Sequence, residues 1–167
     1  MTEILIESES PLWGPPDQWN KLVRRAAEAA LEAAWPWGDA HRARAELSVF
    51  LTDDAGIRAL NRQWRRKDSA TNVLAFPMLE PSEAPTGLET VLLGDVVLSH
   101  ETMAREADTF GISLSDHVAH LVVHGVLHLL GHDHVDDADA ERMEALEGLI
   151  LHRLGIADPY ARQQQAA

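Results

Sequence analysis

The sequence predicts a single domain in which strands and helices are mixed. Its 167 residues are enough for one ordinary domain, which by size scaling would bury roughly 70% of the unfolded chain's surface. Strand patterns alternate with helical segments up to Ser99, and helical periodicity governs the chain after it. We find no internal repeat or linker, so we expect residues 1–167 to form one domain.

The first half of the chain contains the strand patterns. EILIES at 3–8 alternates like a strand, and the alanine-rich stretch at 15–35 has helical periodicity. ELSVFLTDD is predicted to be a second strand, and Asp53 or Asp54 at its end is placed to cap a helix that reaches about Trp64. TNVLAFP and VLLGDVVLS are the third and fourth strands. The polar stretch EPSEAPTGLET between them, residues 80–90, predicts a mobile loop.

The second half is helical. Three helices are expected: from Ser99 to about Phe110, from Ser113 to Leu130, and from about Asp137 to Leu154. Gly131 and Gly155 follow the last two helices, where glycine commonly ends a helix.

Charge and composition limit the classes of function. The formal net charge of −13 argues against casual binding to a polyanion, yet five of the 14 Lys and Arg residues fall between Arg58 and Lys67. The absence of cysteine excludes disulfides, thiolate metal sites and a thiol nucleophile. The start MTEILIESES does not resemble a signal peptide, and no apolar run reaches the roughly 18 residues of a membrane span. We expect a cytoplasmic protein that does not contact a membrane.

Three histidines in HGVLHLLGHDH have the spacing of metal ligands. His124 and His128 are one helical turn apart, so they project from the same face. His134 follows Gly131, which can adopt a left-handed conformation and turn the chain back over the helix end. The spacing matches the zinc-peptidase pattern H-E-x-x-H-x-x-G-x-x-H, but Gly125 replaces the glutamate that serves there as a base. We therefore predict a three-histidine metal site without the peptidase base.

Three neutral imidazoles leave one tetrahedral position of a zinc ion open, as in catalytic sites rather than structural ones. Other histidines nearby have two interpretations each. His117 and His120 lie near the same helix face, where they either pack in the core or line the cleft and contact substrate. Asp133 either accepts the free ring N–H of a ligand or forms the turn. The residues assigned to solvent or packing are His100, His132 and His152.

The histidine motif, together with LNRQWRRKDSATNVLAFP, LLGDVVLS and the closing GIADPY, resembles the YbeY family of bacterial metal-dependent endoribonucleases, which act in ribosomal RNA maturation. The resemblance covers about residues 47–160. It implies an α+β fold with a small, mostly parallel four-stranded sheet packed by about five helices. It also implies one zinc ion held by His124, His128 and His134, although nickel or another divalent ion can occupy such a site in a preparation.

The family's catalytic arginine lies in a segment similar to LNxxYRxKDxPTDVLSFP, and the matching residue here is Arg65. Without the resemblance, Arg65 would be interpreted as a surface residue in a modest ion pair. Arg62, Arg66 and Lys67 are weaker candidates for contacts to the RNA backbone. The sequence departs from the family pattern at Trp64, Ala70, Asn72, Ala75 and His132, and none of these changes removes a proposed ligand or the arginine.

The missing glutamate favours phosphodiester cleavage over amide hydrolysis. Amide hydrolysis at zinc needs a base and a proton donor for the leaving amine, and Gly125 supplies neither. Phosphodiester cleavage instead builds negative charge on phosphoryl oxygens, which a Lewis-acid metal and the forked guanidinium of Arg65 can stabilise. Either hydroxide generated at the metal or the RNA 2′-hydroxyl can be the nucleophile.

The expected function is a zinc-dependent, single-strand-specific endoribonuclease. By the resemblance, it acts in maturation of the 16S rRNA 3′ end and in ribosome quality control, with the small ribosomal subunit and ribosome-assembly factors as partners. Two alternatives stay open: a zinc metallopeptidase, which Gly125 disfavours, and a non-enzymic ribosome-assembly protein stabilised by metal. RNA cleavage that depends on both metal and Arg65 distinguishes them.

Overall fold

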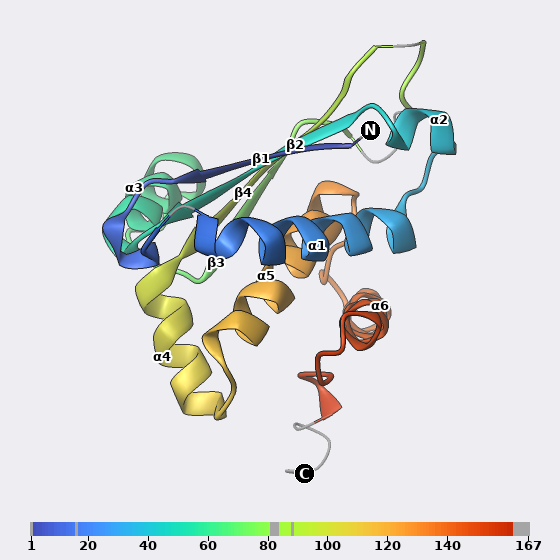
Figure 1. Ribbon diagram of the computed structural model, residues 1–167. Helices are drawn as coiled ribbons and strands as arrows, with labels where there is room; N and C mark the ends of the chain where they lie inside the picture. The colour runs from blue at the N-terminus through green and yellow to red at the C-terminus, as the bar shows by residue number, and fades with distance from the viewer. Residues whose placement is uncertain (1, 16, 81–83, 88, 162–167) are drawn as a thin grey trace.

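The computed structural model describes residues 2–15, 17–80, 84–87 and 89–161. The elements in Figure 1 are β1 (Glu3–Ser8), the 3-10 helix η1 (Pro11–Trp13), α1 (Asp17–Ala34), α2 (Asp39–Arg42), β2 (Ala45–Thr52), α3 (Asp54–Arg65), β3 (Val73–Pro77), β4 (Val91–Ser99), α4 (His100–Phe110), α5 (Leu114–Leu129) and α6 (Asp137–Arg153).

The four strands form one sheet in the order β1-β2-β4-β3. β1, β2 and β4 are parallel, and β3 runs antiparallel to β4 at one edge of the sheet. The predicted α+β class, with a small and mostly parallel four-stranded sheet packed by helices, is confirmed. The edge position of β3 matters for function because it leaves one side of this strand open.

The main core lies between the sheet and the helices α1, α4, α5 and α6, which Figure 1 shows on one side of the strands. α5 is its centre and is buried on nearly every side. The fully buried alanines Ala26, Ala27 and Ala30 of α1 are small, so α1 can approach α5 closely. α5 therefore sits in a fixed position against the sheet.

α3 packs on the opposite face of the sheet. Val96 of β4 belongs to the main core, whereas its neighbour Val97 joins Ile57 of α3 and Leu74 of β3 in a second, smaller cluster. This division follows from the alternation of side chains along a strand. The end of α3 and the face of α5 are thus separated by the sheet edge that β3 forms.

Local capping signals set the helix boundaries close to where they were predicted. Asp53 accepts the backbone N–H of Gly56 at the start of α3, and Ser113 accepts that of Asp116 at the start of α5. α3 ends at Arg65 and is capped by Arg66, a non-glycine residue with a left-handed φ of 59°. The short elements η1 and α2 were not predicted, because three or four residues carry no measurable periodicity.

A partly buried carboxylate ties α3 to α4. Asp54 accepts hydrogen bonds from the hydroxyls of Ser99 at 2.5 Å and Thr102 at 2.6 Å, and from Arg105 Nη2 at 2.9 Å. Burial alone raises the pKa of Asp54, but these hydrogen bonds and the Arg105 charge outweigh it and lower the pKa to about 2. The ionised carboxylate therefore links the two helices at neutral pH.

The loop predicted to be mobile falls partly outside the described residues, at 81–83 and 88, and its other residues belong to no helix or strand. Within the described part of the chain, no single helix is long and apolar enough to cross a membrane. α4 and α5 together have that length and composition, but the chain bends by 116° between them and α5 is the core helix.

Candidate metal centre

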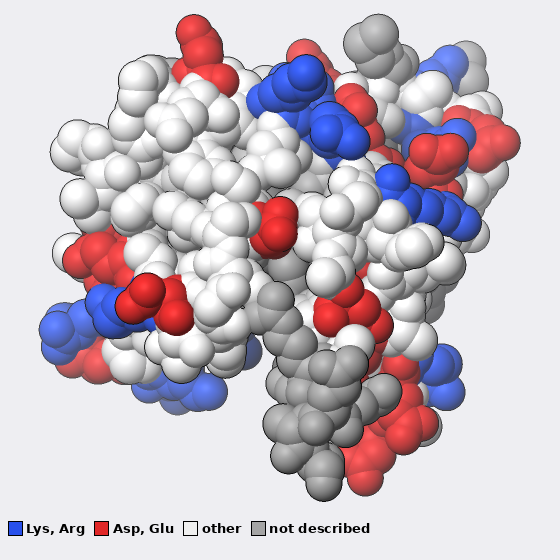
Figure 2. All heavy atoms as spheres, turned by 60° about the horizontal axis from the view of Figure 1, so that its bottom comes forward, with Lys and Arg blue, Asp and Glu red and all other residues white. Residues whose placement is uncertain are grey.

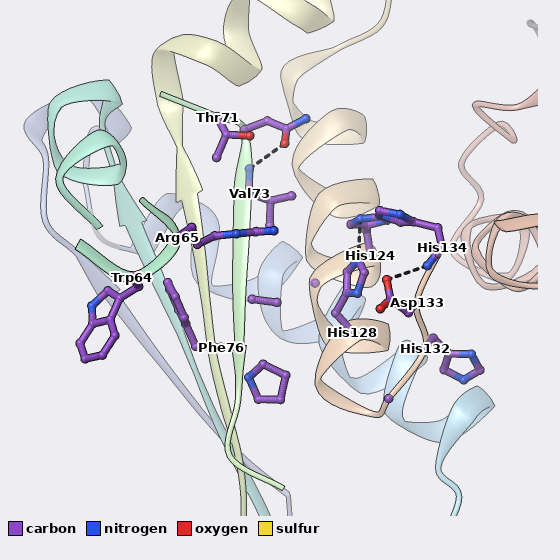
Figure 3. Close-up of a pocket in the computed structure, with 15 residues that line it drawn as sticks. Trp64, Arg65, Thr71, Val73, Phe76, His124, His128, His132, Asp133 and His134 are labelled. Carbon is purple, nitrogen blue, oxygen red and sulfur yellow. Dashed lines mark hydrogen bonds between the residues drawn. The ribbon is translucent and has the colours of Figure 1, made fainter. Parts of the chain in front are cut away.

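A cleft of about 670 Å³ brings the main predicted site residues together. Its walls come from the end of α3, the strand β3, the face of α5 and the loop after α5. His124, His128 and His134 lie on one side, and Arg65 extends from the other side across β3 toward them (Figure 3). Because β3 is an edge strand, a side chain from α3 can reach round it to the α5 face.

The three histidines converge. One ring nitrogen from each of His124, His128 and His134 lies within 4.8 Å of the other two, and the Nε2 atoms of His124 and His128 are 3.1 Å apart. Two nitrogen ligands of a tetrahedral zinc ion at its usual bond length are about 3.3 Å apart. Gly131 has a φ of 98°, and the turn that it makes returns His134 toward α5. The group could hold one divalent ion.

Protonation states also suit metal binding. Burial, together with the neighbouring His124 and His134, lowers the pKa of His128 to about 4, so this imidazole is neutral at pH 7. A neutral imidazole offers the lone pair that a metal ion needs, whereas an imidazolium does not.

Glu147 of α6 fixes the tautomer of His124. This carboxylate is fully buried, lies 2.5 Å from His124 Nδ1 and accepts the Tyr160 hydroxyl at 2.5 Å. Burial alone raises the pKa of Glu147, but the hydrogen bonds from His120, His124 and Tyr160 prevail and lower it to about 2. An ionised carboxylate only accepts, so His124 carries its proton on Nδ1 and leaves the lone pair of Nε2 free.

Sequence reasoning missed Glu147 and Tyr160 and considered Asp133 instead. Asp133 accepts the backbone N–H of His134 at 2.7 Å, so it forms the turn, which was the other interpretation of this residue. A signal for Glu147 was present, because it lies on the helical stripe that also contains the buried residues Met143 and Leu151. A glutamate in such a stripe indicates a buried partner.

His117 and His120 lie outside this cleft and line a second hollow of about 510 Å³, which meets the first at His124. His117 Nε2 is 3.0 Å from Glu106, a carboxylate that also accepts from the side-chain amide of Asn72. His120 is 3.7 Å from Glu147. Of the three histidines assigned to solvent or packing, His100 packs edge-to-face on Trp13, His132 lines the first cleft and His152 is exposed.

The basic residues from Arg58 to Lys67 differ in whether they form an ion pair. Arg58 forms two hydrogen bonds with Asp68, at 2.8 and 3.0 Å. Arg62, Arg65, Arg66 and Lys67 are exposed and make no ion pair with any residue that the structure describes. Figure 2 shows basic side chains in small groups among acidic ones on the face in view. Unpaired cations near the end of α3 are thus a local feature of an acidic molecule.

The fold and the site together define a small α+β protein with a three-histidine group in a cleft at a sheet edge. A family model described as "Endoribonuclease YbeY" matches residues 7–155. The chain belongs to the YbeY endoribonuclease family.

Individual relatives agree with this assignment. Proteins named "Endoribonuclease YbeY" are 46% identical over 165 residues in Rhodopseudomonas palustris strain BisA53 (99% of this chain and 92% of the relative) and 49% identical over 164 residues in Erythrobacter litoralis (93% and 96%). The solution structure of TM1509 from Thermotoga maritima has the same fold, with a TM-score of 0.56 at 22% identity, covering 90% of this chain and 91% of that one.

Proposed function

We propose that this protein is a zinc-dependent, single-strand-specific endoribonuclease that matures the 3′ end of 16S ribosomal RNA and acts in ribosome quality control in the cytoplasm. The small ribosomal subunit and ribosome-assembly factors are the proposed partners. The observation that carries the proposal is the cleft in which Arg65 faces His124, His128 and His134 across β3. Membership of an endoribonuclease family supports the RNA substrate.

Each residue has a chemical role in this proposal. The three histidines hold the ion, which when bound supplies a Lewis acid that stabilises negative charge on a phosphoryl oxygen. Arg65 donates from two guanidinium nitrogens to phosphoryl oxygens, and this contact strengthens as the negative charge develops. Glu147 keeps the proton on Nδ1 of His124, so this ring stays oriented as a ligand. Arg62, Arg66 and Lys67 are proposed to contact neighbouring phosphates.

The environment of Gly125 supports RNA over peptides as the substrate. A Cβ atom added at Gly125 would lie 2.6 Å from Cγ1 of Val96, so the glycine lets α5 approach β4. A glutamate at this position has no room beside the sheet, and the zinc-peptidase base cannot be supplied from here. The metallopeptidase alternative therefore lacks its central residue.

Substitution of Arg65 tests the proposal. Arg65→Ala should keep metal content and melting temperature but lose roughly a thousandfold or more of the single-turnover cleavage rate on saturating single-stranded RNA. Arg65→Lys keeps the charge but not the planar fork, so it should recover only a small part of the rate. Arg58→Ala is the matched control on the same helix, because Arg58 pairs with Asp68 outside the cleft and its loss should leave cleavage unchanged.

The metal requirement is tested in parallel. His128→Ala should lose most of the bound ion, measured by elemental analysis, because two imidazoles hold zinc poorly. Full metal content in that variant would contradict the ligand assignment. Metal-dependent cleavage of casein without cleavage of RNA would favour the peptidase instead, and metal binding with neither activity would favour the non-enzymic assembly protein.

A further inference from the structure

We propose that the exposed Trp64 ring is a platform that stacks an unpaired nucleobase beside the phosphate held at Arg65, with the half-buried Phe76 in the same cleft wall. This proposal rests on the proposed function and deepens it, because it assigns the selection of single-stranded RNA to named side chains. Trp64 is in the last turn of α3, next to Arg65, and Phe76 is in β3. Both line the same cleft as the three histidines.

The platform lies where the next nucleotide would pass. In Figure 3, Arg65 reaches across β3 toward the histidines, and the Trp64 ring lies farther from the histidines than Arg65 does. An RNA strand whose phosphate sits between Arg65 and the histidines must leave the cleft in one of two directions. One direction carries its neighbouring base over the α3 end of the cleft, where the exposed Trp64 ring lies.

Trp64 is exposed in a way that the other tryptophans are not. Its exposed fraction is 66%, whereas Trp13 and Trp19 are buried and donate their indole N–H groups to backbone carbonyls. Trp35 and Trp37 pack edge-to-face on each other. Within the described residues, the Trp64 ring has neither a ring contact nor a hydrogen bond. A large aromatic surface left in water beside a functional cleft indicates a ligand that covers it.

The charges nearby select the kind of ligand. Three cations lie close to Trp64 in sequence. Arg62 precedes it in the last turn of α3, and Arg66 and Lys67 follow it just after the helix. None of them forms an ion pair with a carboxylate in the described part of the chain. An exposed aromatic side chain flanked by unpaired cations matches the alternation of flat bases and phosphates in a nucleic acid strand. The match is tolerant of sequence, because every base has a flat face that can stack.

Stacking on Trp64 also explains why the RNA must be single-stranded. In an RNA duplex both faces of each base are covered by its neighbours, so a side chain cannot reach them without unstacking the helix. An unpaired base is free to turn out of its strand and lie on the indole ring. The platform therefore favours loops, bulges and ends over helical RNA.

The experiment separates binding from chemistry by measuring single-turnover cleavage at increasing concentrations of single-stranded RNA. Trp64→Ala should raise the half-saturating RNA concentration roughly 10- to 100-fold while the rate at saturation stays within a few-fold of the parent. Trp64→Phe should recover most of the affinity because it keeps an aromatic face. Trp37→Ala is the matched control, since it removes a tryptophan outside the cleft and should change neither value.

Abasic RNA identifies the stacked base. Substrates with one abasic nucleotide, moved stepwise past the cleavage position, should show one position that weakens binding to the parent by the same factor as Trp64→Ala. The same abasic nucleotide should not weaken RNA binding by the Trp64→Ala variant any further, because the ring on which the base would stack is already absent. Equal abasic penalties in the parent and in Trp64→Ala, with cleavage still dependent on Arg65, would overturn the platform and leave the proposed function standing. Absence of metal-dependent RNA cleavage by the parent would overturn both.

Discussion

Gly125→Ala is expected to destabilise the fold, because α5 lies directly on β4 at this position. A Cβ atom there would be 2.6 Å from Cγ1 of Val96, closer than real Cβ contacts come, and 3.0 Å from Cγ2, which is also tight. Val96 is fully buried and β-branched, so its side chain has no alternative rotamer that relieves the clash cheaply. Gly125→Ala must therefore shift α5 away from the sheet.

The size of the effect is the difference between two opposing contributions. Overpacking of a buried core usually destabilises by about 1–3 kcal/mol, and a contact this short belongs in the upper part of that range. Alanine also favours the helix over glycine by about 1 kcal/mol. The net loss of unfolding free energy should be about 1–2 kcal/mol, which lowers the melting temperature by about 2–4 °C for each kcal/mol in a chain of this length.

A double-mutant cycle measured by urea unfolding checks the reason as well as the size. Val96→Ala removes both Cγ atoms and leaves Val96 Cβ at 3.4 Å, an ordinary contact. In that background Gly125→Ala should become stabilising by about 1 kcal/mol, because only the helix preference remains. If Gly125→Ala costs the same in both backgrounds, contact with Val96 is not what requires glycine. Gly38→Ala is the control, because a Cβ there meets nothing within 4 Å, and it should change stability by no more than about 0.5 kcal/mol.

Three further predictions concern charge and backbone conformation. Glu147→Gln should weaken metal affinity by about 10- to 100-fold, measured by titration against a competing chelator, because a neutral amide orients His124 less strongly. The depressed pKa of Asp54 contributes stability that is present above about pH 4 and is lost as the pH falls toward 2. Urea unfolding should therefore show that, between pH 5 and pH 2, the parent loses about 1 kcal/mol more unfolding free energy than Asp54→Asn does, after allowance for solvent screening. Arg66→Gly should raise the melting temperature, gaining about 1 kcal/mol, because glycine adopts the left-handed φ without steric cost; an unchanged or lower value would contradict this.

The sequence by itself determined most of the secondary structure and the histidine group. Asp53 and Ser113 cap their helices as their residue types predict, and the helices and strands have close to their expected bounds. His124 and His128 share a helix face because their spacing equals one turn, and Gly131 adopts the positive φ that was expected of it. All of these depend on interactions within a few residues along the chain, which a local pattern records.

The tertiary structure decided what stands opposite the histidines. The sequence alone favoured a surface ion pair for Arg65, and its place in the cleft depends on β3 being an edge strand, which the pattern of the strand does not reveal. Glu147 reaches His124, and Tyr160 reaches Glu147, only because α6 folds back over α5. These contacts join residues far apart in sequence, and their partners are selected by burial and packing of the whole chain rather than by any local period. A single sequence therefore contains the ligands of the site but not the geometry of the groups around them.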